Sequence, residues 1–251
     1  MLDRVRNMAS SWKFKSQCDF NRLMNCRAKK GEAYVPTDVE HVANIITHGF
    51  WVIPSALATL WMVYRSNTYL QYKMALVYGL ALTALFFVSC IFHSLSFIGR
   101  YRKLKNFFHI GDRAIIYIFI ASSYTPWLVL KDLGGLGDET LVIVWTMAAV
   151  GILYQYVFHE KYKWLEIVFY LTVGVCPALV TFTMRDSTGL YELALGGMTY
   201  IAGVVFFKCD GIIPFAHAIW HCFVLVGAML HYYAISAYLL GREKDEVMWG
   251  S

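Results

Sequence analysis

The chain has 251 residues, of which 58% are apolar and only 16% are charged, with a net charge of +5. Soluble domains have about 45–50% apolar and about 25% charged residues, so this composition excludes an ordinary soluble domain. The apolar residues fall in continuous blocks of about 18–25 residues, the length that a helix needs to cross a bilayer. A β-barrel would instead show alternating segments of about ten residues. The sequence predicts an all-α, polytopic membrane protein, for which we expect no nucleic-acid partner.

Seven transmembrane helices are expected to form one bundle in residues 37–240. A basic tail (1–36) precedes this membrane domain, and a short tail (241–251) follows it. The spans are expected at about 44–64, 75–97, 107–130, 141–158, 164–184, 190–207 and 214–240.

The distribution of basic residues predicts the orientation of the bundle. With seven spans, the N-terminal tail and the even-numbered loops share one side of the membrane. That side holds Arg27, Lys29, Lys30, Arg100, Arg102, Lys103, Lys105, Lys161, Lys163 and Lys208 near the span ends. The other side holds Arg65, Lys73, Lys131, Arg185, Arg242 and Lys244. Because basic residues are enriched on the cytosolic side, we expect a cytosolic N-terminus and a lumenal or extracellular C-terminus.

Polar residues recur along the entry to the first span. Thr37 and Glu40 have the spacing of a helix capping box. Glu40, Asn44 and His48 then recur every four residues, which places them on one face of a helix. We interpret this stripe as structural, with Glu40 capping the helix and the other two contacting neighbouring helices.

A second set of polar residues lies where the second span ends and the third begins. Ser89 and His93 share a helix face, and Asp112 follows early in the next span. A carboxylate inside a span is costly unless it is paired or bound to a cation. Its neighbour Arg113 points about 100° away on a helix, so we expect Arg113 to extend toward the head groups instead.

The last span opens with a pair of histidines. His217 and His221 lie one helical turn apart on one face, a spacing at which two imidazoles can bind one metal ion. The alternative is that both histidines only form hydrogen bonds with neighbouring helices. His231 lies roughly 15 Å further along the helix, so we do not expect it at the same site.

Topology places these polar residues at one depth. With the N-terminus inside, His93, Asp112, His217 and His221 all lie within about two turns of the cytosolic membrane face. Three histidines and a carboxylate are the ligand types of a Zn²⁺ site with an open position for water. Asp112 would be a ligand or a base that orients this water, and Ser89 would donate a hydrogen bond to a developing oxyanion.

The same residues carry a resemblance to a known family. Glu40-x3-Asn44-x3-His48, Ser89-x3-His93 with Asp112, and His217-x3-His221 resemble, in order, the three signatures of the progestin and adipoQ receptor family, which is related to haemolysin III. The match covers about residues 36–240, and the segment from Lys208 to His221 looks most like the monocyte-to-macrophage differentiation factor branch. The resemblance implies seven helices with an inside N-terminus, Zn²⁺ held by the three histidines, and Asp112 acting through the metal-bound water.

Two functions remain open from the sequence. The first is a receptor-like or scaffold signalling protein, with cytosolic signalling proteins as partners and zinc joining the helices. The second is a zinc-dependent amide hydrolase that acts on a ceramide-like membrane lipid, with Asp112 and Ser89 as catalytic residues. The resemblance implies a Golgi or endolysosomal membrane rather than the plasma membrane.

Overall fold

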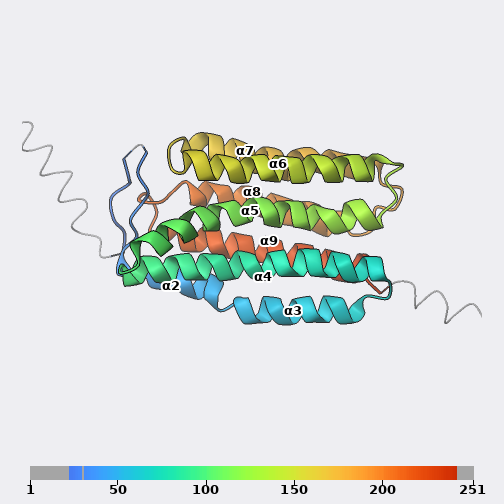
Figure 1. The fold of residues 1–251 in the computed structure, drawn as a ribbon, viewed down its shortest axis with the longest axis horizontal. Coiled ribbons are helices and arrows are strands. Elements are labelled where there is room, and N and C mark those ends of the chain that lie inside the picture. Colours follow the sequence, from blue (N-terminus) through green and yellow to red (C-terminus); the bar gives the residue numbers. More distant parts are fainter. Residues whose placement is uncertain (1–22, 30, 242–251) are drawn as a thin grey trace, which may run out of the picture.

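A computed structural model describes residues 23–29 and 31–241. All regular elements in these ranges are helices, which run side by side along the long axis of the molecule (Figure 1). The two ends of the described chain lie at opposite ends of the bundle, as an odd number of crossings requires. Most of the predicted N-terminal tail (1–22 and 30) and of the predicted C-terminal tail (242–251) lies outside the described residues.

Nine helical elements build the bundle within the described ranges. They are α2 (Asp38–Gly49), α3 (Val52–Arg65), α4 (Tyr69–Ile98), α5 (Arg102–Leu130), α6 (Leu136–Phe158), α7 (Lys163–Val175), the 3₁₀ helix η1 (Cys176–Thr183), α8 (Leu190–Phe207) and α9 (Ala216–Tyr238).

The first membrane segment consists of two helices rather than one. The predicted capping box is confirmed: the Thr37 hydroxyl accepts a hydrogen bond from the Glu40 amide, and the Glu40 carboxylate accepts one from the Thr37 amide. The α2 helix ends at Gly49, and α3 restarts on a displaced axis after Phe50 and Trp51 (Figure 1). The polar stripe of the sequence therefore belongs to a short helix of its own.

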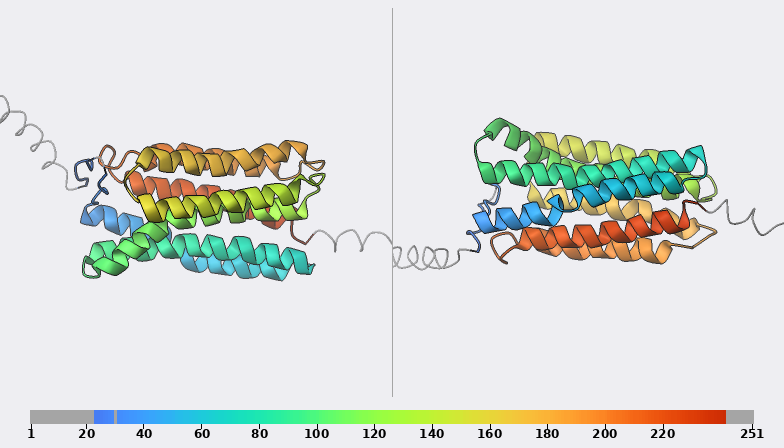
Figure 2. Two further views of the ribbon diagram at one scale, coloured as in Figure 1. Left: turned by 45° about the horizontal axis from the view of Figure 1, so that its top comes forward. Right: turned by 90° about the horizontal axis from the view of Figure 1, so that it is seen from below.

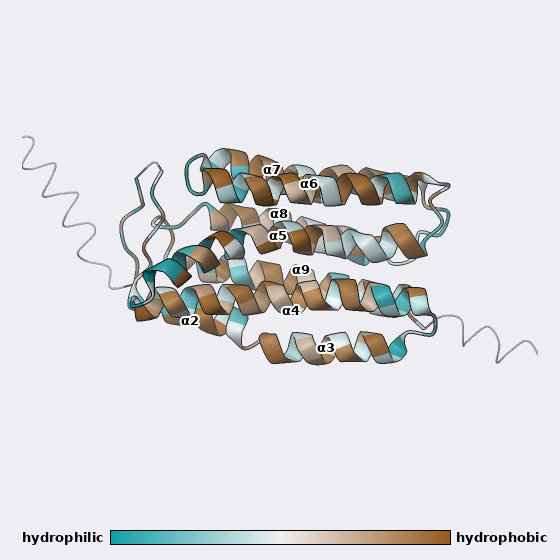
Figure 3. Ribbon diagram, viewed as in Figure 1, coloured by the Kyte–Doolittle hydropathy of each residue, from teal (hydrophilic) through white to brown (hydrophobic). Residues whose placement is uncertain are grey.

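Seven segments of the described chain are long and apolar enough to cross a bilayer, with α2 and α3 counted together and α7 joined to η1. Large apolar side chains point outward along them. On α3, Ile53 is 71% exposed and Leu57 is 61% exposed. The apolar colours of Figure 3 continue along the outer faces of the helices, whereas hydrophilic residues gather at the loops and the start of α5. This confirms the predicted all-α, seven-helix membrane bundle.

Proline changes the type of helix in the fifth segment. The α-helix ends at Val175, and Pro177 falls at the start of the 3₁₀ helix that continues the segment. Proline has no amide hydrogen and its ring clashes with the preceding turn, so it cannot continue the α-helical hydrogen bonds. The Tyr124 hydroxyl donates to the Gly174 carbonyl just before this change.

The core runs along α4, which contacts α2, α3 and α5. Tyr78, in the middle of α4, is fully buried and its hydroxyl donates to the Ala228 carbonyl of α9 at 3.0 Å. At one end of the bundle, α2 also packs on α9 (Figure 2, right). The three helices that carry the histidine motifs of the sequence are thus neighbours in space.

Two adjacent glycines in α8 test how closely this bundle is packed. A Cβ added to Gly196 would lie 2.2 Å from the His231 ring, whereas one added to Gly197 would meet nothing within 4 Å. Gly196→Ala should lower the free energy of unfolding by about 1–3 kcal/mol through overpacking. Gly197→Ala should leave it unchanged or raise it by up to about 1 kcal/mol, because alanine favours helix. Thermal unfolding in detergent measures both, and equal effects would contradict the described α8–α9 packing.

Candidate metal centre and pocket

Three histidines meet at the end of the bundle where α2 begins. His93 comes from the last turns of α4, and His217 and His221 come from the first turns of α9. One ring nitrogen from each lies within 4.8 Å of the other two. The ring centroids are 4.7–5.2 Å apart. The three sequence-predicted ligands therefore converge on one point.

The donor atoms fit a metal ion. His93 is 2% exposed, and neither of its ring nitrogens has a hydrogen-bond partner among the residues that the structure describes. A buried polar group without a partner is costly, so this imidazole calls for a ligand. Three imidazole nitrogens suit Zn²⁺, which takes nitrogen at about 2.0–2.1 Å and leaves a fourth position open in catalytic sites.

Thr47 determines which nitrogen of His221 faces the cluster. Its hydroxyl lies 2.8 Å from the Ala43 carbonyl and 3.0 Å from His221 Nδ1. A hydroxyl has one hydrogen, which the backbone carbonyl receives in this arrangement. Thr47 must then accept a hydrogen bond from Nδ1–H of His221. This tautomer leaves the lone pair of Nε2 free for a metal ion.

Asp210 lies beside His217 as Thr47 lies beside His221. Its carboxylate oxygen Oδ2 lies 3.5 Å from His217 Nδ1. Carboxylates that face the distal nitrogen of a metal-bound histidine orient the ring and raise its basicity. The two clustered histidines of α9, His217 and His221, thus each have a polar partner on the side away from the cluster. Sequence reasoning missed both partners: Thr47 lies off the predicted stripe, and Asp210 reads only as part of a turn.

The polar stripe on α2 supports the cluster from the side. His48 stacks on His221 with ring centroids 3.6 Å apart and an interplanar angle of 13°. His48 also makes a T-shaped contact with Phe86, with ring centroids 5.2 Å apart. Glu40 caps α2 as expected. His231, by contrast, packs on Tyr200 further along α9, away from the cluster.

Asp112 and Ser89 are buried at the same end of the bundle. They are 8% and 2% exposed, and they lie on the packed helices α5 and α4, respectively. Asp112 also lies within electrostatic reach of His217 but does not belong to the group of converging ligand atoms. The arrangement suits a carboxylate that acts near a metal ion rather than one that binds it, and the catalytic roles of Asp112 and Ser89 stay predictions.

The Arg113 side chain is only 13% exposed and pairs inside the bundle, which corrects the expectation that it extends toward the head groups. Its guanidinium donates to Glu166 at 2.9 Å and to Glu160 at 3.2 Å. It also lies over the Phe207 ring, 4.8 Å from the centroid. Two carboxylates from the α6–α7 region compensate this charge inside the bundle, a pairing that no sequence pattern indicates. Glu160 lies in the loop, where burial opposes ionisation but Arg113 and Lys163 prevail and lower its pKa to about 2.

A second group of ligand-type residues lies close to Arg113. His109, His159 and Glu160 bring three donor atoms within 4.8 Å of one another. However, His109 Nδ1 and His159 Nε2 are 2.9 Å apart, a hydrogen-bond distance. The Glu160 carboxylate already accepts from Arg113 and pairs with Lys163 at 2.7 Å. We interpret this group as a hydrogen-bonded ion-pair network rather than a metal site.

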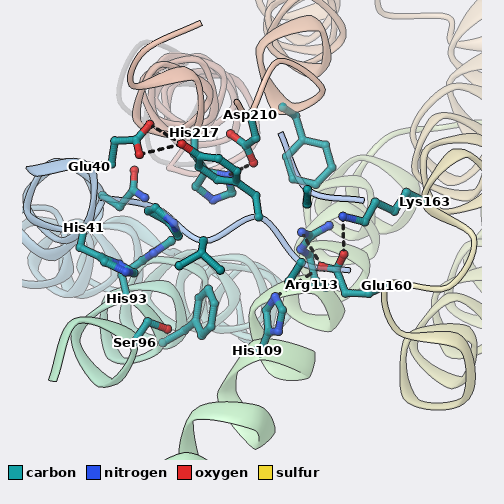
Figure 4. Close-up of a pocket in the computed structure, with 18 of the residues that line it drawn as sticks. Glu40, His41, His93, Ser96, His109, Arg113, Glu160, Lys163, Asp210 and His217 are labelled. Atoms are coloured by element: carbon teal, nitrogen blue, oxygen red, sulfur yellow. Dashed lines mark hydrogen bonds and ion pairs between the residues drawn. The ribbon is translucent and has the colours of Figure 1, made fainter. Parts of the chain in front are cut away.

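A cavity of about 600 Å³ connects the histidine cluster to the end of the bundle. Figure 4 shows His93 and His217 facing this pocket, with Arg113, Glu160 and Lys163 on the opposite wall. Residues before α2 form part of its lining, including Arg27, Tyr34 and Pro36. A small molecule that enters the pocket can therefore reach two of the three clustered histidines.

Comparison with known proteins identifies the family. A family model described as haemolysin-III related matches residues 38–232, which covers all seven membrane segments up to the second half of α9. This chain belongs to the haemolysin III-related family, within which the progestin and adipoQ receptors fall. The resemblance of the spaced motifs is thereby confirmed.

Relatives in animals and bacteria share nearly the whole membrane domain. The chain is 48% identical over 227 residues to human monocyte to macrophage differentiation factor, covering 90% of this chain and 95% of the relative. It is 32% identical over 205 residues to the hemolysin-3 homolog of Bacillus subtilis, covering 79% of this chain and 94% of the relative. Hemolysin-3 of Bacillus cereus is 30% identical over 207 residues.

The role assigned to Thr47 can be tested by metal affinity. Thr47→Val removes the acceptor for His221 Nδ1–H and should weaken zinc binding by about 10–100-fold, the usual effect of losing such a partner. Thr47→Ser keeps the hydroxyl and should bind zinc like the wild type. Competition with a chelator on purified protein measures both affinities. Equal affinities for the valine and serine variants would show that Thr47 does not orient His221.

Proposed function

We propose that the chain is a membrane signalling protein, receptor-like or scaffold in kind, with an intramembrane zinc ion bound by His93, His217 and His221. The convergence of these three imidazoles carries the proposal. A metal ion there would join the end of α4 to the start of α9, with α2 packed on both. A signalling role is supported by the relative named monocyte to macrophage differentiation factor.

We also propose an orientation of the protein in the membrane and a membrane compartment. The histidine cluster would lie near the cytosolic face, with the N-terminus in the cytosol. Basic residues support this orientation, because Lys105, Lys163 and Lys208 lie at the same end of the bundle as the cluster and line its pocket. Cytosolic signalling proteins would meet this basic end. We place the protein in a Golgi or endolysosomal membrane, as the resemblance to its branch implies.

Zinc content of the detergent-purified protein tests the proposed site. The wild type should carry about one zinc ion per chain, since three histidines supply the three protein ligands of one zinc site. His217→Ala should lose the metal, whereas Asp112→Ala should keep most of it, because Asp112 lies outside the ligand group. Elemental analysis of the folded proteins gives all three values. Folded wild type without zinc would contradict the proposal.

The pocket favours a second candidate, a zinc-dependent hydrolase of lipid amides such as ceramides. A purely structural metal ion needs no access, but His93 and His217 line a cavity of about 600 Å³. When bound, zinc would polarise the amide carbonyl and activate water. Water would add to the carbonyl carbon, and the bond from that carbon to the amide nitrogen would break.

We assign the proton transfer and the charge stabilisation of this reaction to two buried side chains, Asp112 and Ser89. Asp112 would take the proton of the attacking water and return it to the leaving amine. Ser89 would donate its hydroxyl hydrogen to the oxyanion that develops on the carbonyl oxygen. Both residues come from the α4–α5 pair that also positions His93, so packing of these helices fixes their separation from the cluster.

Hydrolysis of a ceramide by zinc-loaded protein separates the two candidates. For the hydrolase, Asp112→Asn should lower kcat by about 10²-fold or more, the usual contribution of general acid–base catalysis, while zinc content stays at the wild-type level. For the signalling protein, ceramide turnover should be absent from wild type and variant alike. Activity that survives in Asp112→Asn at full zinc occupancy would exclude the role given to Asp112.

A further inference from the structure

The segment before α2 forms part of the pocket. Residues 23–29 and 31–37, here called the strap, lie at the end of the bundle where α2 begins (Figure 1), and seven of them line the pocket. Inside the strap, the Asn25 amide group donates to the Val35 carbonyl at 2.9 Å. The Tyr34 hydroxyl joins the strap to α2 by donating to Glu40 at 2.8 Å. Lys163 joins it to α7 by donating to the Glu32 carbonyl at 2.5 Å.

The strap also packs directly on the α8–α9 turn. Gly211 has a φ of +75°, and a Cβ built there would lie 2.5 Å from the Cα of Arg27. Close backbone approach of this kind fixes Arg27 next to the turn that carries Lys208 and Asp210. The strap thus holds the cationic side chain of Arg27 within electrostatic reach of Lys208, which also lines the pocket.

Charges around the pocket do not balance. The lining contains more cationic than carboxylate side chains. Its cations are Arg27, Lys29, Lys105, Arg113, Lys163 and Lys208, and its carboxylates are Glu40, Glu160, Glu166 and Asp210. Six positive charges against four negative ones leave an excess of two. Within the described residues, Arg27, Lys29, Lys105 and Lys208 form no ion pair, while Glu160 and Glu166 already bind Arg113.

Like charges are crowded on one side of the pocket. The Lys208 ammonium donates to the Lys163 carbonyl at 3.0 Å and senses the positive charges of Arg113, Lys163 and Arg27. Burial and these cations lower the pKa of Lys208, although Glu166 opposes them. Cations held together in a partly enclosed site repel each other, and a bound anion would relieve that repulsion.

The rest of the lining suits the apolar part of an amphiphile. Phe92, Phe207 and Phe215 contribute aromatic surface to the lining, and Phe207 lies between His217 and the Arg113 guanidinium. Aromatic rings beside cationic side chains accommodate a ligand that carries an anionic group on an apolar body. Lysine and arginine are the usual binders of phosphate groups, through charge-assisted hydrogen bonds.

We propose that this pocket binds a phosphate monoester, whose two negative charges would offset the excess of two positive charges that its lining side chains carry without counting a metal ion. Arg27, Lys105 and Lys208 would contact the phosphate beneath the strap. The ligand is either a phosphorylated lipid headgroup that enters from the membrane surface or a soluble phosphate ester. The phosphate site consists of Arg27, Lys105 and Lys208 and does not depend on zinc at the histidine cluster.

The test uses the full chain in nanodiscs of phosphatidylcholine, with and without phosphatidic acid. Glycerol 3-phosphate serves as the soluble counterpart, and phosphatidylserine at the same mole fraction controls for general attraction to negative membranes. Lipid bound per chain is measured by native mass spectrometry, and soluble ligand by calorimetry. Each sample is measured again after zinc removal with 1,10-phenanthroline, so that loss of the metal and loss of phosphate binding can be distinguished.

Two variants of equal charge decide the result. The pocket variant carries Arg27→Gln, Lys105→Gln and Lys208→Gln. The control variant carries Arg102→Gln, Lys103→Gln and Lys161→Gln, three exposed residues that do not line the pocket. We expect the pocket variant to bind at least about tenfold more weakly, since a hydrogen bond to a charged group contributes about 1.5–3 kcal/mol. The control variant should bind like the wild type.

The measurements distinguish a lipid source of the phosphate from a soluble source, and both from failure of the proposal. Selective binding of phosphatidic acid, lost only in the pocket variant and kept after zinc removal, supports the lipid source. Binding of glycerol 3-phosphate with the same dependence supports the soluble source. Equal loss in both variants, no selectivity over phosphatidylserine and no soluble binding, or binding that disappears with zinc would overturn the proposal.

Discussion

The end of this bundle depends on the cost of burying imidazoles in a membrane protein. Each ring nitrogen taken out of water needs a partner, and the surrounding helices offer His93 none. His217 and His221 approach the same point from α9, and their far nitrogens already face Asp210 and Thr47. One metal ion would satisfy all three rings at once. Without a metal ion, His93 would stay buried with no partner for its ring nitrogens among the described residues.

The helix arrangement follows from this constraint and from apolar packing. His93 lies on α4, which contacts both α5 and α2. It lies at the end of the bundle where Lys105, Lys163 and Lys208 line the pocket. The break between α2 and α3 lets α2 lean on α9, so that His48 stacks on His221. Arg113, Glu160 and Glu166 then form a compensated ion-pair network beside the pocket. We expect function at this end to use a metal ion at the three histidines, the buried carboxylate of Asp112 and the cations that line the pocket.

Much of this organisation could be predicted from the sequence, because bilayer thickness sets the length of apolar segments and helical spacing places His217 and His221 on one face. The meeting of His93 with that pair followed from counting spans. Partners set by tertiary packing could not be predicted. Nothing in the sequence around Arg113 indicates that carboxylates about fifty residues away neutralise it, and nothing near Asp210 shows that its turn brings it to His217.

Anomalous diffraction at the zinc absorption edge, from crystals of the purified full chain, tests the central claim most directly. The account predicts one strong peak at about 2.0–2.1 Å from a nitrogen of each of His93, His217 and His221. It also predicts weak or absent density at His109, His159 and Glu160, where hydrogen bonds and ion pairs occupy the same atoms. A folded bundle with no peak among the three histidines, or with its only peak at the second group, would contradict the account.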